Sequence, residues 1–425
     1  MCQLREKEKT NRQLREKENT NFLIPVVKRK KRERELAQPH ATFSTRKELK
    51  MKQESAFTIY GANQHFHLAS CNFEMATTLS EAYRDNPLHL HHIIPLDFSS
   101  IRTLPDSHAW PQSEDDDDNN KDNYDNDDGP CIPIIDLMDP NAIELIGLAC
   151  EQWGAFQLKN HGIPLNVMEE VEEEAKRLFN LPVNRKLKAL RSGGGATGYG
   201  RARISPFFPK HMWHEGFTIM GSSCDDAKKM WPNDYARFCN TMDNYQNQMK
   251  MLAEKLTNMI FNLLGVSEEQ KAWINTFPQL CEAVQLNFYP CCPEPNRAMG
   301  LAPHTDTSLL TILHQNQTNG LQIFKEGAGW VPVHPHPHTL VVHTGDILHI
   351  LSNSRFRCAL HRVMVNGLRQ RYSMAYFYGP PMDYVLSPLV LHSLPLFRSL
   401  SVKEYIGIKA KNLGGALNLI RMLQN

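Results

Sequence analysis

The sequence of 425 residues predicts a mixed α/β fold, in which a helical N-terminal half supports a β-rich sandwich or jelly roll. Two patterns lead to this prediction. Apolar residues three or four positions apart over 235–264 indicate one long helix with a single buried face. After about Ala283 the apolar runs shorten to strand length and are separated by turn signals, which is typical of sandwiches and jelly rolls.

The N-terminal segment has the composition of an unfolded, solvated chain. QLREKEKTNR at 3–12 is nearly repeated as QLREKENTNF at 13–22, and the basic run KRKKRERE follows at 28–35. Such charge-rich sequence buries too little apolar surface to fold. We therefore expect residues 1–94 to form a disordered charged extension, although the basic run also fits a nuclear-import or nucleic-acid patch. An incorrectly assigned gene start is a further explanation of the repeat.

A second low-complexity stretch, EDDDDNNKDNYDNDD, occupies residues 114–128. Because so many like charges repel one another, we expect an open acidic linker within the segment 95–130. A calcium-binding loop is the alternative, but the stretch lacks the glycine and the terminal glutamate at the spacing that such a loop requires.

Ordered structure is expected from about Ile132 onward. IPIID at 132–136 predicts a strand. Asp139 followed by Pro140 predicts the N-cap and the first position of a helix that continues to about Gln152.

One more strand and then further helices are expected up to about residue 275. AFQLKN at 155–160 predicts a second strand, and an acidic helix is expected over 166–179. Gly265 is expected to end the long helix over 235–264. We assign residues 131–275 to this mostly helical region. The apolar stripe of its long helix consists of Phe238, Met242, Tyr245, Met249, Leu252, Leu256, Ile260 and Leu263.

The next region, 276–400, is expected to form the β-rich core. Its strand-length runs are VQLNFY, SLLTIL, LQIF, WVPV, TLVVH, ILHIL, ALHRVMV and RYSMAYFY. Helical periodicity returns at 402–424, so residues 401–425 are expected to form C-terminal helices.

Charge and cysteine content exclude several classes of protein. A formal net charge of +1 gives no field that would gather nucleic acid or an acidic membrane. The charged start MCQLREKEKT is not a secretory signal, and no apolar stretch is long enough to span a bilayer. Ten cysteines without a CxxC pair suggest reduced thiols rather than a disulfide framework. We therefore expect a soluble, monomeric, cytoplasmic protein, or a nuclear one if the basic run is an import signal.

His304, Asp306 and His361 are the candidate metal ligands. Residues two apart in a strand face the same side, so His304 and Asp306 could reach one metal ion. That pair alone is a weak signal, because one such pair is expected by chance in a chain of this composition. His361 supplies a third ligand from a later strand-like run. Two histidines and one carboxylate suit iron and leave its remaining positions open for other ligands, which a site closed by four protein ligands would not.

The other histidines of the β-rich region are expected to be structural. His314, His343 and His349 lie in predicted strands, where satisfied core or rim histidines are the ordinary case. HPHPH at 334–338 resembles a metal-binding sequence in composition, but its alternating prolines predict a stiff exposed loop.

Arg371 and Ser373 are the candidate anion-binding residues. They also lie two apart, and an arginine there can hold a carboxylate by a two-pronged hydrogen bond, to which a serine hydroxyl can add. A buried arginine without a carboxylate is costly, so a ligand is expected to complete the site. The turn signal at 366–367 predicts that His361 and Arg371 lie on neighbouring antiparallel strands.

HxD, a histidine about fifty residues later and RxS ten residues beyond it together resemble the plant 2-oxoglutarate/Fe(II) dioxygenases over about 132–400. IPIIDL, AFQLKNHGIP, NFYPCCPEPNRAMG, NGLQIF and GDILHILSN resemble the same family. The resemblance implies a double-stranded β-helix (jelly-roll) core, Fe(II), 2-oxoglutarate as cosubstrate, O₂, and ascorbate as reductant. It further implies that Tyr289 donates a hydrogen bond to the 2-oxoglutarate carboxylate and that Asn287 contributes nearby.

Two segments, 95–113 and 197–222, resemble the gibberellin 3-beta-dioxygenase subfamily. This implies hydroxylation of carbon 3 of inactive gibberellins to give active hormone, with succinate and CO₂ as coproducts. Such a substrate is a rigid apolar skeleton with a carboxylate, with which Arg201 or Arg203 could pair. The aromatic residues beside these arginines fit either core packing or pocket lining: Phe207, Phe208, Trp213 and Phe217.

Other functions share parts of this pattern. A gibberellin 2- or 20-oxidase or a flavonoid oxygenase would use the same iron chemistry on another substrate or carbon. An oxidase of the aminocyclopropane-carboxylate type would release no succinate. A zinc hydrolase with the same ligands would need a general base, which is not apparent, and a non-catalytic β-barrel would have no need of the metal ligands.

Overall fold

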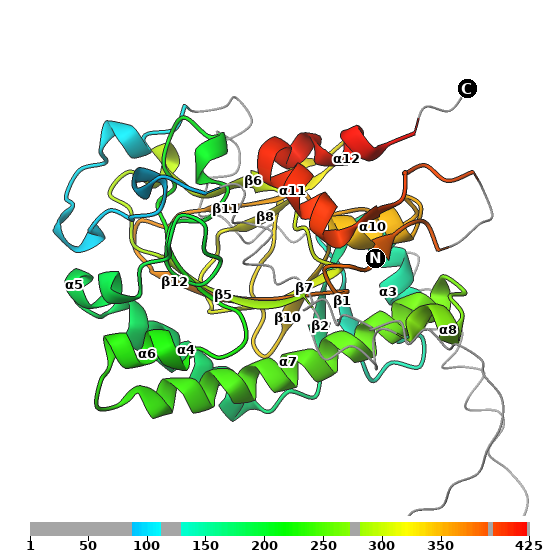
Figure 1. Ribbon diagram of the computed structural model, residues 1–425, viewed down its shortest axis with the longest axis horizontal. Coiled ribbons are helices and arrows are strands. Elements are labelled where there is room, and N and C mark those ends of the chain that lie inside the picture. Colours follow the sequence, from blue (N-terminus) through cyan, green and yellow to red (C-terminus); the bar gives the residue numbers. More distant parts are fainter. Residues whose placement is uncertain (1–86, 112–128, 273–280, 390–393, 423–425) are drawn as a thin grey trace, which may run out of the picture. The chain divides into compact units, whose positions relative to one another are not determined.

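A computed structural model describes residues 87–111, 129–272, 281–389 and 394–422 (Figure 1). Most of the predicted N-terminal extension and the acidic stretch, with its calcium-loop alternative, therefore lie outside the described residues. None of the helices in the described parts combines the length and the apolar character needed to cross a bilayer.

An eight-stranded major sheet forms the larger half of the β core, and β12 lies inside it between β7 and β5. Its pairs are antiparallel except β1 with β2. In spatial order the strands are β1 (Ile134–Asp136), β2 (Ala155–Lys159), β10 (Leu340–Thr344), β7 (Leu310–Gln315), β12 (Arg371–Gly379), β5 (Cys281–Tyr289), β4 (Glu215–Ile219) and β3 (Gly198–Gly200).

A four-stranded minor sheet completes the core, and residues of both sheets line one cavity. In order it contains β6 (Met299–His304), β11 (His361–Met364), β8 (Leu321–Lys325) and β9 (Gly329–Pro332). A short pair, β13 (Val385–Leu386) with β14 (Leu400–Ser401), leads to the C-terminal helices. The predicted mixed fold with a jelly-roll core is confirmed.

The long predicted helix is α7 (Tyr235–Leu263), which packs on α4 (Leu165–Phe179), α3 (Ala142–Gln152) and the major sheet (Figure 1). Its apolar stripe is buried except for Leu263, which is half-buried. Gly265, at φ 68°, lets the chain turn away after the helix. The shorter helices are α5 (Val183–Lys186), α6 (Cys224–Met230), α8 (Glu268–Lys271), α10 (Asp346–Leu351), α11 (Val402–Asn412) and α12 (Ala416–Ile420). Single 3₁₀ turns are η1 (Leu90–His92), η2 (Phe98–Ser100), η3 (Asp106–His108), η5 (Leu187–Ala189), η6 (Ser205–Phe207), η7 (Pro295–Arg297) and η8 (Leu413–Gly415).

Strand β12 shows how one sheet serves both the core and the cavity. Its side chains alternate between the two faces. Arg371, Ser373, Ala375 and Phe377 line the cavity between the sheets. Tyr372, Met374, Tyr376 and Tyr378 belong to the hydrophobic core that the helices share.

Two local predictions are wrong. ILHIL at 347–351 was expected to be a strand but lies in α10, which places His349 on a helix. A run whose apolar residues are all buried has no periodicity that separates a short helix from a strand. The helix expected to start at Pro140 begins at Ala142, because the Asp139 carboxylate accepts the Asn141 N–H at 2.8 Å in a turn before the helix.

The prediction that His361 and Arg371 lie on neighbouring strands is also wrong. β11 pairs with β6 and β8 in the minor sheet, whereas β12 pairs with β5 and β7 in the major sheet. The Asn366 side chain accepts the N–H groups of Leu368 and Arg369, each at 2.8 Å, so a turn does form. It carries the chain from one sheet to the other instead of closing a hairpin.

Candidate metal and cosubstrate site

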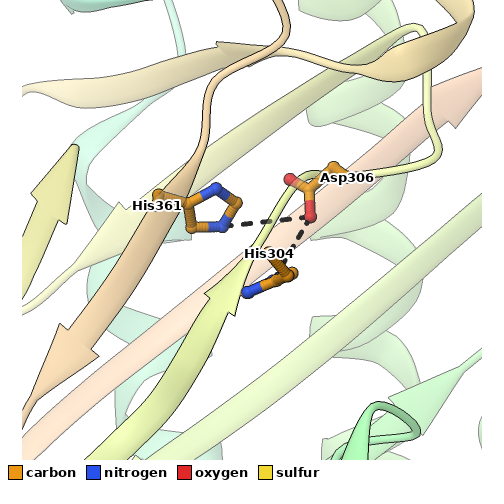
Figure 2. A group of neighbouring side chains, drawn as sticks. All are labelled: His304, Asp306 and His361. Carbon is orange, nitrogen blue, oxygen red and sulfur yellow. Dashed lines mark ion pairs between the residues drawn. The ribbon is translucent and has the colours of Figure 1, made fainter. Parts of the chain in front are cut away.

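The three candidate metal ligands meet where the minor sheet ends (Figure 2). His304 is the last residue of β6 and pairs across the ladder with His361, the first of β11. Asp306 Oδ1 lies 3.7 Å from His304 Nε2 and 3.9 Å from His361 Nε2. Among the described residues this is the one group of three or more such side chains close enough to share a metal ion. Asp306 follows the strand, so the predicted proximity holds, but strand alternation is not its cause.

Both histidines present the correct nitrogen for a metal. His304 Nδ1 lies 2.8 Å from the Ala302 carbonyl, and His361 Nδ1 lies 3.0 Å from the Ala359 carbonyl. A carbonyl can only accept, so each Nδ1 carries the proton and each Nε2 keeps a lone pair toward Asp306. Burial lowers the pKa of both imidazoles, that of His361 strongly, which favours the neutral form that binds metal.

Asp306 is held as an ionised carboxylate with one oxygen turned toward the histidines. Burial alone would raise its pKa, but His361, followed by His343 and His304, keeps that pKa below its usual range. The other oxygen, Oδ2, accepts the Thr311 hydroxyl at 2.7 Å. Two neutral imidazoles and one carboxylate facing one another suit a divalent iron ion.

The remaining histidines do not all match the expectation of satisfied structural residues. His343, on β10, lines the cavity and lies 3.8 Å from Asp306 Oδ2, and neither ring nitrogen has a hydrogen-bond partner among the described residues. His314 is buried, with Nε2 4.0 Å from Glu172 and no partner for Nδ1 in the same parts of the chain. His349 Nδ1 is satisfied by the Phe356 carbonyl at 2.7 Å. The HPHPH segment is a loop, as predicted.

All four candidate cosubstrate residues lie on β5 and β12, which are neighbouring antiparallel strands of the major sheet. Arg371 is opposite Tyr289, and Ser373 is opposite Asn287. The Ser373 hydroxyl lies 3.4 Å from both Arg371 Nη1 and Asn287 Nδ2. The side-chain oxygen of Asn287, Oδ1, lies 2.9 Å from His214 Nε2, and this contact fixes the orientation of the Asn287 side-chain amide.

Arg371 forms an incomplete anion-binding site. Its side chain is only 2% exposed, its Nη2 donates to Gln315 Oε1 at 2.8 Å, and its guanidinium lies 5.1 Å from the centre of the Tyr289 ring. Among the described residues, Tyr289 is the one titratable group that acts on the Arg371 guanidinium, no ion pair with a carboxylate is found, and the Arg371 Nε has no hydrogen-bond partner. A buried cation without a counter-ion is costly, so a ligand carboxylate fits this position.

The metal ligands and Arg371 line one cavity of about 570 Å³, within the size range of small-molecule pockets. Apolar side chains from both sheets and from the C-terminal helices form much of the wall. They include Leu301, Leu313, Leu321, Val363, Ala375, Phe377, Val402, Ile406 and Leu413.

The two candidate substrate arginines have different positions. Arg203 lines the cavity, and its Nη1 donates to the Gly195 carbonyl at 2.6 Å. Arg201 is buried but does not line the cavity, and its backbone N–H donates to Ile93. Arg191, which the sequence did not single out, also lines the cavity.

The neighbouring aromatic residues divide between the cavity and the core. Phe207 lines the cavity. Phe208 packs near Trp110 with ring centroids 5.6 Å apart, while Trp213 and Phe217 are buried in hydrophobic clusters.

Two family models match the chain. The 2OG-Fe(II) oxygenase superfamily matches residues 280–380, which contain all seven predicted metal-binding and cosubstrate-binding residues, from Asn287 to Ser373. The N-terminal region of non-haem dioxygenases in morphine synthesis matches residues 132–237.

Relatives match over most of the chain. The gibberellin 3-beta-dioxygenase 1 of Pisum sativum is 47% identical over 352 residues, covering 81% of this chain and 94% of the relative. The gibberellin 3-beta-dioxygenase 1 of Arabidopsis thaliana is also 47% identical, covering 82% and 99%.

Solved structures share the fold. JOX2 in complex with 2OG, Fe and JA has a TM-score of 0.65 and 28% identity, covering 77% of this chain and 96% of that one. The dioxygenase for auxin oxidation in rice has a TM-score of 0.56 and 22% identity, covering 68% and 100%, which supports the fold alone.

Proposed function

Since this chain belongs to the gibberellin 3-beta-dioxygenases of the 2OG-Fe(II) oxygenase superfamily, we propose that it hydroxylates carbon 3 of gibberellins in the cavity between its two sheets. The inactive precursor becomes the bioactive hormone, and succinate and CO₂ are the coproducts. One observation supports the assignment of the reaction to this cavity. Two imidazole Nε2 atoms that face Asp306, on the minor sheet, and the buried Arg371, on the major sheet, line the same cavity.

His304, Asp306 and His361 would hold Fe(II) through the two Nε2 atoms and Asp306 Oδ1. Fe(II) bound there supplies the oxidising chemistry, in which O₂ and 2-oxoglutarate are consumed and ascorbate maintains the reduced metal. The protein contributes geometry. The Ala302 and Ala359 carbonyls fix the two rings, and the Thr311 hydroxyl fixes the carboxylate.

Arg371 and Ser373 would bind the distal carboxylate of 2-oxoglutarate. The guanidinium offers a fork of donors, and Gln315 holds its Nη2 so that the fork keeps one orientation. The Ser373 hydroxyl adds a donor beside it, oriented by Asn287. The Tyr289 ring lies beside the guanidinium, at 5.1 Å from its centre, and stabilises the cation by a cation–π contact.

The rest of the cavity would hold the substrate. Its apolar wall suits a rigid hydrocarbon skeleton, and Arg203 supplies a cation for the substrate carboxylate. Arg201 is less well placed to bind the substrate carboxylate, because its side chain does not line the cavity. We therefore expect Arg203→Ala to raise the KM for gibberellin about tenfold or more, through loss of a charge-assisted hydrogen bond, while Arg201→Ala changes it less. Equal effects of the two substitutions would contradict this placement.

Anaerobic reconstitution tests the function. The full chain is loaded with Fe(II) and 2-oxoglutarate, then given air, ascorbate and a 3-deoxy gibberellin, and the products are read by mass spectrometry. We expect a 3β-hydroxylated gibberellin and an equal amount of succinate, both lost in His304→Ala. Succinate without that product would point to a gibberellin 2- or 20-oxidase or a flavonoid oxygenase. Turnover without succinate would point to an oxidase of the aminocyclopropane-carboxylate type.

We further propose that the protein acts as a cytoplasmic monomer on this small molecule, without a nucleic-acid or membrane partner. The net charge of +1 supports only the absence of a nucleic-acid or membrane partner, since it creates no field that would attract nucleic acid or an acidic membrane surface. Size-exclusion chromatography with light scattering would contradict the monomer if it gave a larger mass, and a nuclear fluorescent fusion would contradict the compartment.

A further inference from the structure

Helix α11 (Val402–Asn412) lies near the C-terminal end of the chain (Figure 1). It forms part of the cavity wall. Val402, Ile406, Lys409 and Ala410 of this helix line the cavity. Three of these four are apolar, as a gibberellin pocket requires. Lys409 is the exception, and at 7% exposure it is a buried cation that the reaction does not use.

The bonds of Lys409 explain why a cation is there. Its Nζ donates to the Thr305 carbonyl and to the Thr305 hydroxyl, each at 2.8 Å, and to Asp346 Oδ2. A lysine ammonium has three donors, so these acceptors use all of them. Lys409 is thus turned toward the wall and keeps no donor for a ligand in the cavity.

Thr305 lies between two metal ligands, and its carbonyl belongs to the peptide group that precedes Asp306. The peptide group that follows Asp306 is held too, because the Asp346 N–H donates to the Asp306 carbonyl at 2.8 Å. Strand β6 ends at His304, so no sheet ladder holds this turn. The backbone on both sides of Asp306 is therefore fixed by Asp346 and by Lys409, which the Asp346 carboxylate also holds.

We propose that Lys409 is a positioning residue for the metal site, which makes the docking of α11 a condition for correct placement of Asp306. The inference rests on the proposed iron site. Residues that hydrogen-bond to a metal ligand hold it in the orientation that the metal needs, and a hydrogen bond to the backbone beside the ligand has the same effect. Loss of such a contact typically weakens metal binding about 10–100-fold.

Lys409→Met in the full chain tests the proposal, since methionine keeps the length of the side chain but donates no hydrogen bond. Fe(II) affinity is measured by anaerobic titration calorimetry, together with Tm. Removing the lysine also leaves Asp346 as a buried, unpaired carboxylate, which destabilises the fold. The double variant Lys409→Met/Asp346→Asn removes that charge and keeps the backbone N–H that Asp306 needs.

We expect Fe(II) to bind about 10–100-fold more weakly to both variants, while the Tm of the double variant returns toward that of the wild type. Recovery of Fe(II) affinity in the double variant would overturn the proposal. The weaker Fe(II) binding of Lys409→Met would then result from the lower stability of that variant and not from the lost hydrogen bonds to Thr305. An increased KM for gibberellin with unchanged Fe(II) affinity would also overturn it, since Lys409 would then be a substrate contact. Wild-type protein that bound no Fe(II) would instead overturn the proposed function, and this inference with it.

Lys186→Met is the matched control. Lys186 is also a buried lysine paired with a carboxylate, but its backbone acceptor is the Phe179 carbonyl, at the end of α4. This substitution should lower Tm without changing Fe(II) affinity. A similar loss of Fe(II) affinity in Lys186→Met would show that any buried lysine has this effect, and would overturn the proposal.

Discussion

Two buried clusters, each made of a lysine, a carboxylate side chain and a tyrosine, lie in different parts of the molecule. In each, a single carboxylate oxygen accepts hydrogen bonds from a lysine ammonium and from a tyrosine hydroxyl, and the lysine also donates to a backbone carbonyl. The Lys186 cluster consists of Lys186, Glu215 and Tyr199, and the Lys409 cluster consists of Lys409, Asp346 and Tyr405.

The clusters differ in what the lysine and the carboxylate connect. The Lys186 cluster links α5 to strands β3 and β4, at the edge of the major sheet. The Lys409 cluster links α11 to α10 and to the turn that carries Asp306. A lysine, a carboxylate and a tyrosine thus contribute to stability in both places. They contribute to metal geometry only where the lysine also donates to the turn that carries a metal ligand. Composition and burial alone do not reveal which role a cluster has.

The control substitution Lys186→Met should distinguish the roles of the two clusters most clearly, because it should lower stability without changing Fe(II) binding. It leaves Glu215 buried at 3% exposure without its counter-ion, so the free energy of unfolding should fall by about 3–5 kcal/mol. Urea denaturation followed by circular dichroism measures this change. Fe(II) affinity should stay within about twofold of the wild type, well inside the 10–100-fold expected when an outer contact is lost.

The pH dependence of the stability of Lys186→Met should show that the charge of Glu215 causes the loss of unfolding free energy. Burial raises the pKa of Glu215, and Lys186 opposes that rise, so the pKa increases further in Lys186→Met. A folded-state pKa above the unfolded one means that stability is retained at low pH and is lost as the pH rises through the folded pKa. The deficit relative to wild type should therefore shrink between about pH 8 and pH 5. In Lys186→Met/Glu215→Gln it should be small at every pH, and a pH-independent deficit in the single variant would contradict this account.

The sequence predicted more of the site than of the connections around it. The sequence predicted that five side chains act at one site, and the structure places all five along one cavity. Short spacings brought His304 near Asp306 and Arg371 near Ser373, whereas His361 was singled out by its residue type and its place in the motif. Which strands are neighbours was not identifiable, because pairing depends on contacts between residues far apart in the chain. The error over β11 and β12 arose from a turn signal that is real but joins two sheets.

The outer contacts of the site were missed for the same reason. Thr311 and Gln315 lie two residues either side of Leu313, so strand alternation could have placed them on one face. Nothing local indicates that this face meets Asp306 and Arg371. Lys409 is more remote, since 104 residues separate it from Thr305 and its helix has an ordinary charged sequence. Such long-range partners can be found only once the fold is known.

The smallest expected effects come from the tyrosines, and they provide the finest test of the comparison. Tyr199→Phe and Tyr405→Phe each remove one hydrogen bond to a buried carboxylate, at 2.7 Å in both clusters. Each substitution should therefore lower the free energy of unfolding by about 1.5–3 kcal/mol. Only Tyr405 restrains the carboxylate that holds Lys409. Tyr405→Phe should therefore weaken Fe(II) binding severalfold, less than Lys409→Met does, while Tyr199→Phe leaves it unchanged. Calorimetry on the matched pair decides this, because equal stability losses with equal Fe(II) affinities would mean that the Lys409 cluster only stabilises the fold.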